Sequence, residues 1–286
     1  MAARSYLYVP ADRPAMLARA LERGPDAVIV DLEDAVAPDA KDAARRAAAD
    51  WLAGLDPSGP TEVWVRVNPG RTGLLDATAV ASPALHGLCL AKCETPDEVA
   101  GVDSLLAERE LSLGLPPGAI RLSPLLESAA AVLAAPALAA APRVAHLQGG
   151  EADLRADLGM DPDPVDEREM LPIRVSLVLA CAAARVGPPV GPVSTDYRDT
   201  DALHRSTLAL RRLGYRSRAC IHPAQIPVIH EVFTPSPTEL AAARALVTRF
   251  DTAVRNGTPV LVGPDGRMID EAVVRAARRL LTTPNA

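Results

Sequence analysis

Two carboxylates, Glu127 and Asp153, follow two successive apolar segments of the chain, 122–126 and the segment that begins at His146. An acidic residue at the end of a strand delivers an oxygen ligand to one edge of a sheet or barrel. Two such strands can hold a hard cation such as Mg²⁺ and leave sites open for substrate and water. Arg66, at the end of another apolar segment, could bind a substrate carboxylate through its guanidinium. If these three strand ends point the same way, the chain is a metal-dependent enzyme for a small acid.

Further polar residues follow other apolar segments and would share the same edge of a parallel barrel. They are Asp31, Glu33, Asp34, Asn68, Lys92, Glu94, Glu151 and His222. Any one of them could simply begin a loop, but several charges beside buried strands are costly unless they are paired. The acids at 31–34 could bind a metal, bind its water molecules, or cap the helix that begins near Pro38. Gly149-Gly150 would allow close backbone approach to a ligand, although a plain turn explains the pair equally well.

The elements that would position these residues repeat one pattern, a short apolar segment followed by a helical stretch rich in Ala, Leu and Arg. Eight such apolar segments occur, at 6–9, 27–31, 63–67, 88–91, 120–123, 144–147, 190–193 and 218–221. Alternating strand–helix units form parallel sheets, and eight of them close a barrel, so we predict an α/β fold of the (β/α)₈ TIM-barrel type. The seventh segment is a poor strand because Pro192 lies inside it and proline lacks a backbone donor. A doubly wound open sheet is the alternative.

Helices are predicted over 39–52, 96–108, 168–186, 200–213, 237–255 and 271–281, with a break or a start near Pro172. Asp265-Gly266 predicts a tight turn. We expect residues 1–235 to form the barrel and residues 236–286 to form a C-terminal helix and lid segment. Because this second part lies beyond the eighth strand–helix unit, it could be a lid or an arm that contacts a neighbouring subunit.

Bulk composition excludes several classes of protein. The formal net charge of −6 argues against nucleic-acid binding. No apolar run reaches the roughly 18 residues that span a bilayer, and the N-terminus has no signal-peptide core. The cysteines, which are Cys89, Cys93, Cys181 and Cys220, lack the spacing of a zinc site and suit thiols in a reducing cytosol. We therefore expect a cytoplasmic protein that binds neither nucleic acid nor membrane.

A series of ordered motifs resembles one known family over nearly the whole chain. The motifs lie at 4–14, 31–36 with Lys41 and Arg45, 65–68, 125–128, 150–154, 221–226 and 266–270. Their residue types and order resemble the citrate lyase β-subunit / malyl-CoA lyase family, within the superfamily that also holds class II pyruvate aldolases. The resemblance implies a TIM barrel, Mg²⁺ with Mn²⁺ as a possible substitute, and reversible Claisen cleavage of a 3-hydroxyacyl thioester.

The resemblance also implies roles for particular residues. Glu127 and Asp153 match the metal ligands of the family, which agrees with their position at strand ends. Arg66 matches the arginine that binds the 2-oxo acid and stabilises the thioester enolate. Asp270 matches an acid/base on a C-terminal lid that often closes over the site of a neighbouring subunit. We therefore expect a homo-oligomer, either a trimer or a hexamer.

Residues that would contact the substrate follow from the same resemblance. Glu33 and Asp34 resemble groups that lie close to the metal-bound water and the substrate. Three residues match positions that contact coenzyme A in relatives, and they are Tyr8, Arg13 and Arg19. The small-molecule partners would be an acyl-CoA and a 2-oxo acid.

The predicted activity is that of a Mg²⁺-dependent acyl-CoA lyase, which would cleave citramalyl-CoA, malyl-CoA or a close homologue to acetyl-CoA and a 2-oxo acid. Two alternatives are a class II pyruvate-type aldolase that acts on free acids, and a non-catalytic homologue that binds acyl-CoA. The chain departs from the family at Ala91, Gly149, Val190-Gly191 and Glu271. These departures leave the metal pair, Arg66 and Asp270 intact and concern the shape of the pocket.

Overall fold

The computed structural model describes residues 3–163, 165–258, 260–263 and 266–282. The chain divides into two compact units, one spanning Ala3–His230 and a C-terminal unit that begins at Glu231. The expectation that the second unit acts as a lid stays a prediction. Among the described residues, no helix is long and apolar enough to cross a membrane.

The first unit is built around a closed barrel of eight strands, each hydrogen-bonded to the next. The strands are β1 (Ser5–Pro10), β2 (Ala27–Asp31), β3 (Glu62–Val67), β4 (Gly87–Leu90), β5 (Arg121–Leu126), β6 (Gln148–Gly149), β7 (Val190–Gly191) and β8 (Ser217–Cys220). Every neighbouring pair is parallel, and β1 pairs with β8 to complete the circle. The predicted TIM barrel is therefore confirmed, and the alternative of an open doubly wound sheet is wrong.

Two strands differ from the sequence prediction. The predicted sixth strand at 144–147 contributes only an isolated bridge between Val144 and Leu122, and β6 itself begins at Gln148. The seventh strand is reduced to Val190-Gly191 by the surrounding prolines, yet it still pairs with Ser217 and Arg218 of β8. Two residues are enough to close the barrel because both flanking strands hold the register.

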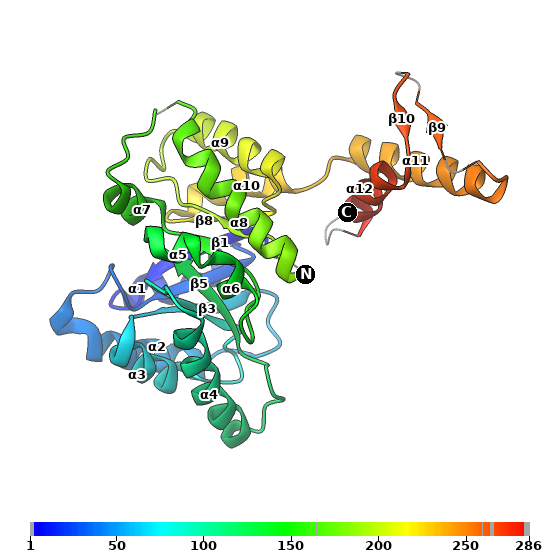
Figure 1. Cartoon of the computed structure of the whole chain (residues 1–286). Coiled ribbons are helices and arrows are strands. Elements are labelled where there is room, and N and C mark those ends of the chain that lie inside the picture. Colours follow the sequence, from blue (N-terminus) through cyan, green and yellow to red (C-terminus); the bar gives the residue numbers. More distant parts are fainter. Residues whose placement is uncertain (1–2, 164, 259, 264–265, 283–286) are drawn as a thin grey trace. The chain divides into compact units, whose positions relative to one another are not determined.

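Helices follow the strands and surround the barrel (Figure 1). Those of the first unit are α1 (Pro14–Leu17), α2 (Lys41–Ala53), α3 (Gly70–Val80), α4 (Pro96–Leu113), α5 (Ala129–Leu133), α6 (Ala135–Ala139), α7 (Glu151–Leu158), α8 (Leu171–Ala184) and α9 (Thr200–Leu213), while α10 (Ile226–Phe233) crosses into the second unit. Pro172 lies in the first turn of α8, where proline is tolerated, so the predicted helix start is confirmed. The local sequence pattern did not predict α1, α3, α5, α6, α7 or α10.

Aromatic side chains fill part of the barrel interior. Tyr6 and Trp64 belong to one buried cluster with residues from β2, β4, β7 and β8. The His146 ring packs against both, with ring centroids 5.5 Å from Tyr6 and 5.0 Å from Trp64. Gly87 of β4 is required beside Trp64, because a Cβ atom there would lie 2.3 Å from the Trp64 ring.

The buried imidazole of His146 should make the protein less stable in acid. Burial lowers the pKa of His146 to about 4, with a smaller contribution from the charge of Arg121, and its Nε2 has no hydrogen-bond partner. An unfolded histidine titrates near 6.5, so the unfolded chain binds more protons between pH 6.5 and 4. The free energy of unfolding should therefore fall by about 2 to 3 kcal/mol from this group as pH falls through that window.

Urea unfolding at several pH values measures this effect. The free energy of unfolding should change less with pH in His146→Leu than in the parent protein over this window. The same pH dependence in both proteins would assign the acid sensitivity to other groups.

The C-terminal unit contains α11 (Pro237–Arg255), a two-stranded antiparallel sheet of β9 (Leu261–Val262) and β10 (Met268–Ile269), and α12 (Glu271–Leu281). Phe250, Ile269 and Val274 form its buried core. In the predicted turn between the two strands, Asp265 lies outside the described residues, whereas Gly266 has the positive φ of 77° that glycine favours.

Candidate functional site

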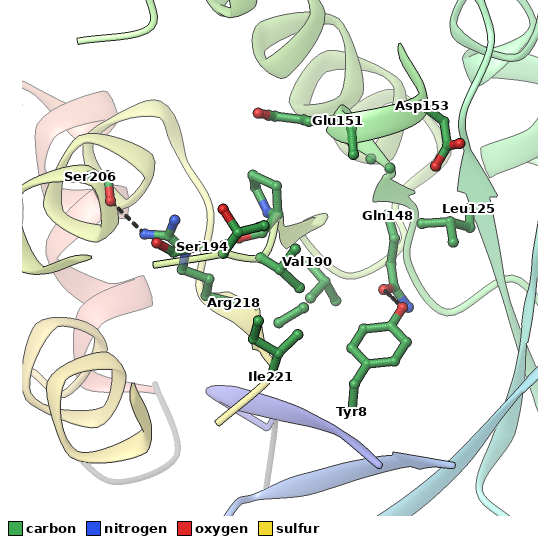
Figure 2. Close-up of a pocket in the computed structure, with 18 of the residues that line it drawn as sticks. Tyr8, Leu125, Gln148, Glu151, Asp153, Val190, Ser194, Ser206, Arg218 and Ile221 are labelled. Atoms are coloured by element: carbon green, nitrogen blue, oxygen red, sulfur yellow. Dashed lines mark hydrogen bonds between the residues drawn. The ribbon is translucent and has the colours of Figure 1, made fainter. Parts of the chain in front are cut away.

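A cavity of about 1100 Å³ lies at the carboxyl ends of the barrel strands. Its walls include Tyr8 of β1, Arg66 of β3, Gln148 of β6 and Val190 of β7. Figure 2 shows Tyr8, Gln148 and Val190 around this space, with Asp153 on one side and Arg218 on the other. This is the end at which TIM barrels place their chemistry.

Three carboxylates meet at one side of the cavity. One oxygen from each of Asp34, Glu127 and Asp153 lies within 4.8 Å of the other two. Asp34 follows β2, Glu127 follows β5, and Asp153 lies in the first turn of α7. The pairing of Glu127 with Asp153 was predicted from the sequence, and the structure adds Asp34 to it. A set of carboxylate oxygens at this spacing suits a hard divalent cation.

Glu127 is buried and held in place by backbone groups on both sides. Its Oε2 accepts a hydrogen bond of 2.7 Å from the backbone N–H of Lys92. A Cβ atom on Gly150 would lie 2.4 Å from Cγ of Glu127, so only glycine leaves room for this side chain. The Gly149-Gly150 pair is thus more than a plain turn, and the group that approaches Gly150 is a carboxylate of the protein. Burial, with a smaller contribution from the charge of Asp153, raises the pKa of Glu127 to about 7.

Arg66 is held in place by a bidentate ion pair with Asp31. Its Nε and Nη2 donate to the two carboxylate oxygens of Asp31 at 2.7 and 2.6 Å, and Asp31 is 2 % exposed. Nη1 lies 3.1 Å from an oxygen of Glu33 and 3.6 Å from Asp34. Burial alone would lower the pKa of Arg66, but hydrogen bonds to Asp31 raise it above its usual value. Arg66 is therefore charged, and its guanidinium is held in a fixed orientation beside the three carboxylates.

Lys92 links the acids at 33 and 34. Its Nζ donates to Oε1 of Glu33 at 2.5 Å and to Oδ1 of Asp34 at 3.3 Å. Its φ of 50° is unusual for a residue other than glycine. This side of the cavity holds five carboxylates but only two cationic groups among the described residues. The cations are Arg66 and Lys92, and the carboxylates are Asp31, Glu33, Asp34, Glu127 and Asp153. A bound divalent cation would offset most of that excess.

Tyr8 lies in the cavity next to Arg66, which stacks over the phenol ring at 5.2 Å from its centroid. The Tyr8 hydroxyl donates to Oε1 of Gln148 at 3.5 Å, and the Gln148 amide donates in turn to Ser123 at 3.0 Å. Burial raises the pKa of Tyr8 well above its usual value, so the phenol stays protonated. The sequence analysis did not single out Gln148, because nothing in its local pattern distinguishes it.

The other predicted site residues lie elsewhere. Arg13 and Arg19 are exposed on either side of α1, where they pair with Asp12 at 3.6 Å and Glu22 at 3.8 Å, and neither lines the cavity. Their contact with coenzyme A stays a prediction. Asp270 belongs to the C-terminal unit, where its Oδ1 accepts hydrogen bonds from the backbone N–H groups of Ala272 and Val273 and caps α12.

Known proteins resemble this chain along its length. A family model described as HpcH/HpaI aldolase/citrate lyase matches residues 4–223. A citrate lyase subunit beta-like protein of Deinococcus radiodurans is 34% identical over 98% of this chain and 96% of its own length. A (3S)-malyl-CoA thioesterase of Cereibacter sphaeroides is 31% identical over 99% and 95%. The crystal structure of CitE from Mycobacterium tuberculosis in complex with magnesium, acetoacetate and coenzyme A matches with a TM-score of 0.76 and 29% identity, over 98% of this chain and 97% of that one.

Proposed function

Because the chain belongs to the HpcH/HpaI aldolase/citrate lyase family, we propose that it is a Mg²⁺-dependent acyl-CoA lyase. The reaction would be reversible Claisen cleavage of a 3-hydroxyacyl-CoA, such as citramalyl-CoA or malyl-CoA, to acetyl-CoA and a 2-oxo acid. The observation that carries this proposal is the meeting of Asp34, Glu127 and Asp153 beside the fixed guanidinium of Arg66. The magnesium, acetoacetate and coenzyme A bound by the CitE relative support it.

In this proposal Glu127 and Asp153 hold Mg²⁺, and Asp34 either adds a third oxygen or binds a water molecule of the ion. The donor set fits this ion, since all three groups are carboxylates and the surrounding charge is negative. Bound Mg²⁺ would polarise the carbonyl of the 2-oxo acid and stabilise negative charge on its oxygen.

Arg66 would bind the carboxylate of the 2-oxo acid and stabilise the enolate oxygen of the departing acetyl thioester. Asp31 holds the guanidinium through two hydrogen bonds, so no reorientation is needed when charge develops. Glu33 would act through Arg66 and Lys92, since its two oxygens contact both cations.

Asp270 is proposed to protonate the enolate carbon in the cleavage direction and to remove a methyl proton from acetyl-CoA in the reverse direction. The proposal holds whether Asp270 comes from the same chain or from a neighbouring subunit of a homo-oligomer. An aspartate that also caps a helix allows a clean test, because asparagine caps equally well but cannot transfer the proton.

The test is to incubate the purified protein with Mg²⁺ and each thioester and to identify the products. A lyase releases acetyl-CoA and a 2-oxo acid, whereas a thioesterase, the activity named for one relative, releases free coenzyme A and a hydroxy acid. We expect acetyl-CoA from the parent protein and a rate lower by at least about a hundredfold from Asp270→Asn. Absence of acetyl-CoA from every thioester would refute the lyase, and turnover of a free hydroxy acid would favour the pyruvate-type aldolase.

Two adjacent glycines provide a matched test of the metal site. A Cβ atom at Gly150 would collide with Glu127, whereas one at Gly149 meets only a methyl group of Leu177 at 3.4 Å. Gly150→Ala should therefore displace Glu127 and weaken Mg²⁺ binding by about tenfold or more, and Gly149→Ala should leave it close to that of the parent. Isothermal titration with Mg²⁺ measures both, and equal affinities in the two variants would contradict the assignment of Glu127.

A further inference from the structure

One wall of the cavity contains a buried arginine whose hydrogen bonds all go to neutral oxygens. Arg218 of β8 is 4 % exposed and borders the cavity. Its Nε donates to the carbonyl of Pro192 at 2.9 Å, and its Nη1 donates to the hydroxyls of Ser206 at 2.8 Å and Thr207 at 2.7 Å. Figure 2 shows the bond to Ser206. The carbonyl of Leu203 is a longer fourth acceptor at 3.4 Å.

The remaining nitrogen of this guanidinium, Nη2, makes no hydrogen bond within the described part of the chain. Two acids in the same wall are already engaged in ion pairs with other arginines. Glu151 accepts two hydrogen bonds of 2.7 Å from Arg174, and Glu167 is shared between Arg174 and Arg155. These two carboxylates thus pair with two other arginines, and none of the ion pairs among the described residues involves Arg218.

An unbalanced buried charge is costly, because its hydration is lost and no ion pair replaces it. Burial, with a smaller contribution from the charge of Arg174, lowers the pKa of Arg218 to about 10, so the group remains charged at neutral pH. Ser194 also lines the cavity, and its hydroxyl makes only a long contact of 3.4 Å with the carbonyl of Asp196, whereas the hydroxyl of Ser206 already donates to the carbonyl of Ala202 at 2.9 Å. A guanidinium nitrogen and a hydroxyl donor together suit an oxygen-rich anion.

We propose that the Arg218 side of the cavity binds an oxyanion, either a carboxylate or a phosphate, with Arg218 as its cationic contact. The carboxylates of Asp34, Glu127 and Asp153 would repel such a group, so the anion belongs to a different part of the cavity from the proposed metal ion. This site stands on the geometry of Arg218 and does not depend on lyase activity.

The test is calorimetric titration of the metal-free protein, in the presence of EDTA, with sodium phosphate and separately with sodium succinate. We expect at least one of the two anions to bind the parent, and Arg218→Gln to bind it about tenfold more weakly or worse. Arg205→Gln is the matched control, because Arg205 is an exposed arginine that lines the same cavity. It should leave the affinity unchanged.

Binding of phosphate alone would identify a phosphate-bearing ligand, and binding of succinate alone a carboxylate. Each supports the site. Lack of binding of either anion, an unaffected Arg218→Gln variant, or equal weakening in Arg205→Gln would overturn it. Should Arg218→Gln fail to fold, parent crystals soaked in selenate decide the matter. An anomalous selenium peak within hydrogen-bond distance of Arg218 supports the site, and crystals with no peak there refute it.

Discussion

Replacing Asp153 by Asn is expected to weaken Mg²⁺ binding by at least about a hundredfold and to reduce thioester cleavage to the background rate. The physical reason is that one of three carboxylates within 4.8 Å of one another loses its charge. The fold should survive, because the Asp153 charge is one of the groups that raise the pKa of Glu127, and its removal relieves repulsion. Isothermal titration with Mg²⁺ and thermal unfolding without Mg²⁺ measure the two effects separately.

Asp157→Asn is the matched control for this variant. Asp157 lies one turn further along α7 and accepts a hydrogen bond of 2.7 Å from the backbone of Ala129, which an asparagine can also accept. It does not line the cavity. Mg²⁺ affinity should therefore be unchanged in Asp157→Asn. If Asp153→Asn bound Mg²⁺ as tightly as this control, Asp153 would not be a ligand.

The second large effect is expected at Arg66. Arg66→Met removes both hydrogen bonds to the buried Asp31 and leaves its carboxylate unpaired, at a cost of about 3 to 5 kcal/mol in the free energy of unfolding. The rate of cleavage should also fall by about a hundred- to a thousandfold, because a positioned donor for the enolate is lost. Urea unfolding and steady-state kinetics measure the two losses.

Two further variants separate stability from activity. The double variant Asp31→Asn/Arg66→Met removes the unpaired charge, so we expect it to recover much of the stability but none of the activity. Arg45→Met breaks a comparable pair, in which Nε of Arg45 lies 2.6 Å from the buried Asp76, at a position that does not line the cavity. It should lose stability and keep its turnover number. An Arg66 variant that behaved like Arg45→Met would show that Arg66 is purely structural.

Local pattern predicted parallel strand–helix units and the edge that carries the acids, and its count of eight units favoured a barrel over an open doubly wound sheet. Each apolar segment predicts one strand, and strands that alternate with helices along the chain pair in a parallel sheet. The pattern was weakest at 190–193, where β7 proved to be two residues that both pair with β8. It also placed the sixth strand at 144–147, whereas β6 is Gln148–Gly149.

The sequence by itself determined that Glu127 and Asp153 follow the strands of two successive strand–helix units. This follows from the order of apolar and polar residues along the chain. Only the tertiary structure decided which side chains meet. Asp31 pairs with Arg66 because the β2–β3 register places them opposite each other, and Asp34 joins the carboxylates from another strand end. Likewise, Glu151 and Glu167 are engaged by other arginines, and Arg218 forms no ion pair among the described residues. Such contacts depend on closure and register between segments far apart in the chain, which no local pattern encodes.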